Sequence, residues 1–393
     1  MPTTTPPKRH TVLDFRTLLQ ACPREKDRAK ILILQFISEN GKASRKMVIQ
    51  ALRMRPSTVS NSIAEMIDDG LLSELSMRTN AHRGRPELFL SINPDRFWAI
   101  SFSIMSMSLI ITIANFAGEV VEERILPLDR HLSATQMTSI LNGLITEHTA
   151  TVPEGTHLLG YGIAFPGLID KKANLWRMVS RFPNMKNLKF EGIIGFSEGK
   201  VLFERNIDAI LNYRLLADPE ARKETSLLLH WGYGIAISFA ANGKLLQSGG
   251  GLFGEIGHWT VPGGDSDTQT IETLAAAPAC MQEHEWSEDF DEASITQSGF
   301  ISQEKLKDLY TIIAQVMRNL HLTFFPDTFY LLSPFVDAAI TEHLSQGLSE
   351  TLRPFAVKAP KVINLHYSSD SEAMGMVSSL FSQTLGPFLQ ARW

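Results

Sequence analysis

Two side chains with complementary hydrogen-bonding chemistry, Glu255 and His258, stand one helical turn apart in the short segment GEIGHWTV. The Glu255 carboxylate offers two acceptor oxygens, and the His258 imidazole can donate or accept a hydrogen bond. Gly254 and Gly257 have no side chains, so the backbone can approach a ligand closely at both positions. Converging groups of this kind suit neighbouring hydroxyls of a sugar. The alternative is that Glu255 and His258 form a buried pair whose hydrogen bonds satisfy each other.

A second set of polar side chains falls on one face of a helix that we expect to begin near Pro56. The apolar face of this helix consists of Val59, Ile63, Met66 and Ile67. The opposite face carries Ser57, Thr58, Ser60, Asn61 and Ser62. Short polar side chains on an exposed helix can approach base edges in the DNA major groove.

The elements around this helix predict a winged helix-turn-helix over residues 20–94. Helices over about 27–39 and 44–54 supply the apolar stripes of a tri-helical core, and proline is tolerated in a first helical turn. Beyond Gly70, the strand-like segments LLSEL and LFLSI flank the basic loop SMRTNAHRGRPE, as in a wing. Arginines on such a loop suit a narrow minor groove, although the loop could also be a solvated surface. The residues predicted to contact DNA are Arg45, Ser57, Thr58, Ser60, Asn61, Arg83 and Arg85.

The remainder of the chain, residues 95–393, alternates apolar strands with amphipathic helices. This pattern predicts an α/β fold with mixed sheets, arranged as two lobes around a cleft. A hairpin is expected about Asn242 and Gly243. Residues 1–19 open with the polar, proline-rich MPTTTPPKRH, and we expect them to be disordered.

Charge separates the two parts of the chain. Residues 1–96 hold 16 Lys and Arg against 10 Asp and Glu, whereas residues 97–393 hold 21 against 32. A basic head on an acidic body is expected if the head alone meets DNA phosphates. No apolar run approaches the length of a transmembrane helix, and no secretory signal is evident, so we expect a cytoplasmic protein without membrane insertion. The two cysteines, Cys22 and Cys280, lie too far apart in sequence to indicate a disulfide framework.

The order of these motifs resembles the ROK family of repressors and sugar kinases, in its DNA-binding branch of NagC, Mlc and XylR type. The resemblance rests on the helix-turn-helix, the GRP loop, NFAGEVV, GIAFPGLID, GYGIAISFAANGK and GEIGHWTV. It implies an actin-like (ribonuclease H-like), two-lobed sugar-binding domain and a homodimer or dimer of dimers. It also implies which residues contact the effector: Asn184, Arg205, Asn206, Glu255, His258 and Glu272.

The chain departs from the kinases of that family at each catalytic element. The glycine-rich turn that cradles phosphate is replaced by Ser103–Met107, Tyr233 stands between the glycines of the second turn, and SPF replaces the glycine pair at 333–335. Arg205 and Asn206 stand where the family's asparagine and catalytic aspartate are expected, and an amide cannot accept the hydroxyl proton. Asp208 is left as an alternative base. Arg205 would favour an anionic ligand, or would form a surface salt bridge.

A metal site and a cofactor are also not expected. The family's zinc-binding cysteines correspond here to Gly263, Asp265 and Thr270, which leaves His258 without suitable partner ligands. The sequence therefore predicts a transcriptional regulator, with repression as the family habit, that binds double-stranded operator DNA and responds to a sugar or sugar derivative, rather than an enzyme. The alternatives are a regulator controlled by a protein partner and a sugar kinase with a DNA-binding head.

Overall fold

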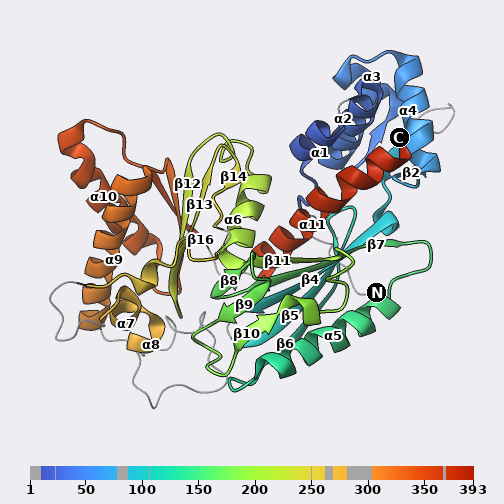
Figure 1. The fold of residues 1–393 in the computed structure, drawn as a ribbon. Coiled ribbons are helices and arrows are strands. Elements are labelled where there is room, and N and C mark those ends of the chain that lie inside the picture. Colours follow the sequence, from blue (N-terminus) through green and yellow to red (C-terminus); the bar gives the residue numbers. More distant parts are fainter. Residues whose placement is uncertain are drawn as a thin grey trace, which may run out of the picture.

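The computed structural model describes residues 10–22, 24–77, 87–105, 107–248, 250–261, 269–280, 303–365 and 369–393. Within these ranges a winged helix-turn-helix lies above one of two α/β lobes, and the other lobe stands beside it (Figure 1). None of the helices in these ranges combines the length and the apolar character that a membrane crossing requires.

The predicted winged helix-turn-helix is present. Its helices are α1 Phe15–Ala21, α2 Glu25–Asn40, α3 Arg45–Leu52 and α4 Pro56–Asp68. Its antiparallel sheet has the order β1-β3-β2, from β1 Ala43–Ser44, β2 Leu72–Met77 and β3 Glu87–Ile92. The Ser44 hydroxyl caps α3 by accepting from the Met47 backbone N–H, and Pro56 starts α4, where its missing N–H costs no hydrogen bond. Val48, Val59 and Ile63 are fully buried, as their spacing predicts.

The expectation of disorder over residues 1–19 is wrong from His10 onward; residues 1–9 lie outside the described ranges. The His10 backbone N–H donates to the Gly118 carbonyl at 2.8 Å, which anchors this segment to the first lobe. Asp14 caps α1 by accepting from two backbone N–H groups, and Leu18 is 1% exposed. The sequence prediction relied on the proline-rich residues at the start of the chain and did not take into account Asp14, which can cap a helix.

The first lobe contains a five-stranded sheet, in the order β11-β7-β4-β5-β6. The strands are β4 Phe97–Met105, β5 Ser108–Asn115, β6 Val120–Pro127, β7 His157–Phe165 and β11 Val201–Arg205. β4, β5 and β6 pair antiparallel, whereas β7 joins β4 and β11 in parallel. Helix α5 Ala134–Ala150 begins with a capping box at Ser133. A small antiparallel sheet is formed by β8 Leu168–Asp170, β9 Leu175–Met178 and β10 Lys186–Lys189.

The second lobe repeats this arrangement. Its sheet has the order β14-β13-β12-β15-β16. The pairs β14–β13 and β13–β12 are antiparallel, whereas β12–β15 and β15–β16 are parallel. The strands are β12 Ser226–Trp231, β13 Ile235–Ala241, β14 Lys244–Leu245, β15 Thr328–Leu332 and β16 Lys361–Leu365. The helices are α6 Asn206–Ala217, α7 Ile271–Ala275, α8 Ala277–Cys280, α9 Gln303–Phe324 and α10 Ala338–Leu352. The recurrence of one strand order confirms the predicted two-lobed α/β fold.

Helix α11, Ser369–Arg392, joins the first lobe to the winged domain (Figure 1). It packs against α6 and the faces of β4 and β7, and its far end lies beside α1. Leu385 and Leu389 of α11 belong to the same buried cluster as Ile31 of α2. The winged domain and the first lobe therefore share a hydrophobic core, and the chain boundary near residue 94 does not separate two independent cores.

Candidate functional site

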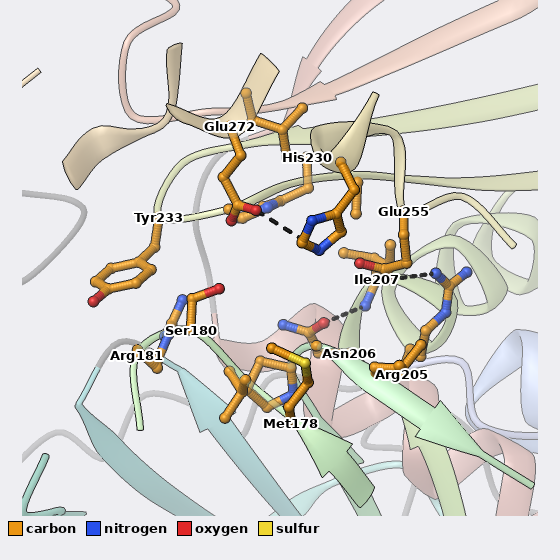
Figure 2. Close-up of a pocket in the computed structure, with 18 of the residues that line it drawn as sticks. Met178, Ser180, Arg181, Arg205, Asn206, Ile207, His230, Tyr233, Glu255 and Glu272 are labelled. Carbon is orange, nitrogen blue, oxygen red and sulfur yellow. Dashed lines mark hydrogen bonds and ion pairs between the residues drawn. The ribbon is translucent and has the colours of Figure 1, made fainter. Parts of the chain in front are cut away.

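A cavity open to solvent lies between the two lobes (Figure 2). The first lobe contributes Gly167, Met178, Ser180 and Arg181. The junction of β11 and α6 contributes Arg205, Asn206 and Ile207. The second lobe contributes His230, Tyr233, Glu255, His258 and Glu272. Five of the six residues predicted to contact an effector thus line one cavity.

The sixth, Asn184, does not line this cavity, and its contact with an effector stays a prediction. Its side chain is exposed, and its amide donates to the His131 carbonyl at 3.0 Å. The neighbouring Phe182 and Met185 insert into the core of the first lobe, which turns Asn184 outward. Ser180, earlier in the same loop, reaches the cavity instead.

Arg205 ends β11 and is 6% exposed, so the alternative of a surface salt bridge is wrong. Its Nε donates to Asp208 Oδ2 at 3.1 Å, and its Nη2 donates to Asp208 Oδ1 at 2.9 Å. Nη2 also donates to the Ile237 carbonyl at 3.3 Å. Nη1 donates to the Phe253 carbonyl at 2.7 Å and to Glu255 Oε1 at 3.2 Å. The guanidinium therefore connects α6, β13 and the loop that carries Glu255.

Asp208 is held by the same network and does not line the cavity between the lobes. It is 3% exposed, and its Oδ1 also accepts from the Ser238 hydroxyl at 2.7 Å. It faces a smaller, separate space that Arg205 and Gln247 also line. Asp208 is therefore engaged in an ion pair away from the place where a sugar hydroxyl would sit.

Asn206 is the first residue of α6. Its Oδ1 accepts from the Ile207 backbone N–H at 2.9 Å, and its amide nitrogen is turned toward the middle of the cavity (Figure 2). This arrangement presents a donor to a ligand rather than a base, because the amide oxygen is already occupied by the backbone.

Glu255 comes directly before the short 3-10 helix η3 Ile256–His258. Gly254 has φ 85°, and a Cβ there would lie 2.1 Å from the Ile237 carbonyl oxygen, so only glycine lets this loop lie against β13. Burial raises the pKa of Glu255 above its ordinary value, and the Arg205 charge partly opposes that rise. The alternative of a buried pair with His258 is wrong, because the His258 side chain is 61% exposed.

Glu272 faces the cavity from α7, whose first turn is capped by Thr270. Burial raises the pKa of Glu272, while His258 and a hydrogen bond from Ser180 act in the opposite direction. His258 Nε2 lies 3.9 Å from Glu272 Oε2. The cavity thus presents two carboxylates, Glu255 and Glu272, from the same lobe (Figure 2).

Sequence reasoning missed two residues that meet across the cleft. Arg181, from the first lobe, places its guanidinium 4.9 Å from the ring centroid of Tyr233, from the second lobe. Arg181 is 5% exposed. The glycines at 232 and 234 signalled a turn, but nothing in the local sequence indicated that an arginine some 50 residues earlier would stack on its tyrosine.

Positions aligned with the nucleotide site of a kinase are filled by packed side chains. Ile104 is fully buried at the end of β4, and Met107 packs against the core of the first lobe. Phe335 is 2% exposed, and its ring centroid lies 5.0 Å from that of Trp231. These contacts support the expectation that the backbone there does not present an open phosphate cradle.

The second candidate site is the outward face of α4. Of the side chains predicted to contact DNA, those at Ser57, Thr58, Ser60 and Asn61 are exposed. Ser62 is 2% exposed and faces the core beside Ile63, so its assignment to the exposed face is wrong. Arg45 is partly exposed and pairs with Glu74 of β2 at 2.6 Å, a contact that competes with phosphate.

Two further predictions fall outside the described residues. Arg83 and Arg85 lie in the predicted wing loop between β2 and β3, and Gly263 and Asp265 lie in the loop compared with a zinc site. Within the described ranges no group of three metal-ligating side chains comes together. The wing contacts and the expectation of no metal stay predictions.

No protein-family model matches the chain. A xylose repressor of Caldicellulosiruptor bescii is 28% identical over 239 residues, which cover 59% of this chain and 58% of that protein. The chain thus spans about three fifths of that relative's length. A xylose repressor of Staphylococcus xylosus is 21% identical over 375 residues, 90% of this chain and 94% of that protein. Among solved structures, a ROK family transcriptional regulator homologous to the Mlc protein of Escherichia coli has a TM-score of 0.67 at 17% identity, covering 97% of this chain and all of that one.

Proposed function

We propose that this chain is a member of the ROK family and a DNA-binding transcriptional regulator whose cleft binds a sugar effector and has no kinase activity. The observation that carries this proposal is the presence on one chain of two surfaces of different chemistry. One is the exposed polar face of α4, and the other is a cleft lined by carboxylates and an amide. Repression of carbohydrate genes in the cytoplasm, by a homodimer on a palindromic operator, is part of the proposal.

The α4 face supports DNA binding because its side chains are short, polar and exposed. Opposite this face, α4 packs on α2, and Glu65 of α4 holds both Lys26 and Lys30 of α2 at 2.7 Å. A recognition helix must be held firmly against the rest of its domain, because base contacts depend on its position in the groove.

The cleft supports effector binding without phosphoryl transfer. Asn206 stands where a base would be required, and Asp208 is committed to Arg205 and Ser238. A general base must lie within hydrogen-bonding reach of the proton that it removes. The curated relatives reported above are repressors named for xylose, so pentoses are among the first effectors to test.

A continuous path of packed elements connects the cleft to the recognition helix. Asn206 begins α6, and Asn212 of α6 donates to Ser379 of α11 at 3.0 Å. At the other end of α11, Trp393 Nε1 and Arg392 Nη1 contact Asp69 at 2.9 and 3.2 Å. Asp69 caps the C-terminal end of α4. We propose that effector binding closes the lobes and alters the spacing of the paired heads, driven by the effector's differential affinity for the two arrangements.

The experiment is operator binding by the full chain with and without sugars. Operator candidates come from footprints upstream of neighbouring genes. Asn61→Ala should weaken operator binding by about tenfold and relax sequence preference, because one base-edge contact is worth about 1–3 kcal/mol. Asn319→Ala, a matched change of an exposed amide on α9, should leave both unchanged.

Four outcomes would contradict parts of the proposal. Unchanged operator affinity in Asn61→Ala would remove the α4 assignment. A sugar that binds by calorimetry but leaves operator affinity unaltered would remove the coupling. Sugar phosphorylation in the presence of ATP would restore the kinase alternative, whereas operator release by a protein and by no sugar would favour control by a protein partner.

A further inference from the structure

We infer that the cleft selects uncharged polyhydroxy sugars and discriminates against their phosphorylated and carboxylated derivatives, because Arg205 is neutralised from within the protein. This inference rests on the proposed function, since it names the class of effector for the same cleft. It reverses the expectation from sequence that Arg205 would attract an anion.

The donors of Arg205 are all in use. A guanidinium has five N–H groups, one on Nε and two on each Nη. Nε and Nη2 grip the Asp208 carboxylate, and the second N–H of Nη2 meets the Ile237 carbonyl. Nη1 reaches the Phe253 carbonyl and Glu255. A bound anion would have to displace one of these partners from a buried network, so Arg205 acts as a positioning residue that holds Glu255 against the cavity.

The negative charge around Arg205 is also larger than its own positive charge. Asp208 and Glu255 are two carboxylates around one guanidinium; the contact with Asp208 is buried, and the contact with Glu255 is partly buried. Glu272 adds a third carboxylate on the cavity wall. A phosphate or carboxylate group placed beside Glu255 and Glu272 would meet like charge in a partly desolvated space, where repulsion is poorly screened.

Hydroxyl groups match what the cavity offers. Glu255 uses Oε1 for Arg205, which leaves Oε2 to accept a hydrogen bond from a ligand, and Glu272 is a further acceptor. Asn206 turns an N–H donor into the same space (Figure 2). A sugar hydroxyl both donates and accepts, so it can bridge these groups, whereas ionised phosphate oxygens mainly accept.

Arg181, a second arginine on the cavity wall, does not reverse the preference for uncharged groups over anions. Its guanidinium lies over the Tyr233 ring at 4.9 Å. The adjacent Ser180 hydrogen-bonds Glu272. An anion at Arg181 would have to share that guanidinium with the Tyr233 ring.

The test is calorimetry on the full chain with matched ligand pairs. The probes are glucose with glucose 6-phosphate and gluconate, N-acetylglucosamine with its 6-phosphate, and xylose. At pH 7.5 the best uncharged sugar should bind at least about tenfold more tightly than its charged partner. Asp208→Asn and Glu255→Gln each remove one negative charge with little change in size, and both should narrow this ratio. Glu147→Gln, at an exposed ion pair with Arg124, should not change it.

Three results would contradict the inference. Tighter or equal binding of a phosphorylated sugar by the wild type would overturn the selectivity while leaving the effector cleft in place. Failure of every sugar and derivative to bind would remove the effector cleft itself, together with the selectivity. A variant that weakened both members of a pair equally would show that its residue only supports the local structure, and would contradict the assigned charge effect.

Discussion

Glu204 is a buried carboxylic acid whose replacement should stabilise the protein above neutral pH. It lies on β11, is 6% exposed, and has no hydrogen-bond partner for Oε2 among the described residues. Burial raises its pKa from 4.5 to about 7; the Asp208 charge adds to the rise, while Lys171 and a hydrogen bond from Ser379 oppose it. Near neutral pH, the fold must therefore either keep this side chain protonated or bury its charge.

The magnitude follows from the difference between the two pKa values. In the unfolded chain Glu204 ionises near pH 4.5, and in the folded chain near pH 7. Between these values the folded state holds more protons, so the free energy of unfolding decreases as pH rises through that window. At about 1.36 kcal/mol for each pKa unit, the loss is about 3 kcal/mol and is complete above pH 7. Glu204→Gln has no carboxyl to ionise, so its free energy of unfolding should not show this loss.

The assay is urea unfolding of wild type and Glu204→Gln at pH 5 and pH 8. The variant should differ little from wild type at pH 5 and should be more stable by about 3 kcal/mol at pH 8. Glu198→Gln, at an exposed pair with Lys200, is the matched control and should show no such gain. Equal stability of Glu204→Gln and wild type at pH 8 would refute the argument that ionisation of this side chain opposes folding.

Three other predictions concern α11 and the cleft. Gly375→Ala should destabilise by about 1–3 kcal/mol in urea unfolding, because its Cβ would lie 2.1 Å from the Ala209 carbonyl oxygen; Gly347→Ala, in open space on α10, should not. Trp393→Ala removes a hydrogen bond to Asp69 and the ring 4.3 Å from Lys30 Nζ, and should reduce the effect of sugar on operator affinity in binding assays. Burial raises the pKa values of Glu255 and Glu272, so affinity for an uncharged sugar should begin to fall on acidification at a higher pH than free glutamate side chains would give. Calorimetry over a series of pH values measures this, and an affinity that does not change with pH would contradict both carboxylates as acceptors.

Much of the fold was predictable because local patterns and tertiary packing agree. Val59, Ile63 and Met66 repeat at helical spacing and are all fully buried in α4. The Asn242–Gly243 turn also forms as predicted, with positive φ at both residues, between β13 and β14. Such elements are specified by residues near one another in the chain.

The cleft was less predictable because its chemistry depends on partners that are distant in sequence. Arg205 meets Glu255, 50 residues away, and Ile237, 32 residues away, and these contacts convert an apparent anion-binding arginine into an internal ion pair. Asn184 lies outside the cavity for a different reason. The buried residues on either side of it, rather than its own chemistry, decide which way it points.

The connection between the winged domain and the first lobe was not predictable from the sequence. The connection from β3 to β4 passes through η1 Pro94–Arg96 and enters the core at Phe97, whose ring contacts Phe388 of α11 with centroids 5.1 Å apart. A linker that ends in this core cannot act as a free hinge, because its opening would expose the aromatic side chains that the winged domain and the first lobe share. Movement of the second lobe relative to a joined head and first lobe is therefore the physically economical response to a ligand in the cleft. In the proposed mechanism, that movement would begin at Asn206, at the start of α6, and would reach α4 through the contacts of α11.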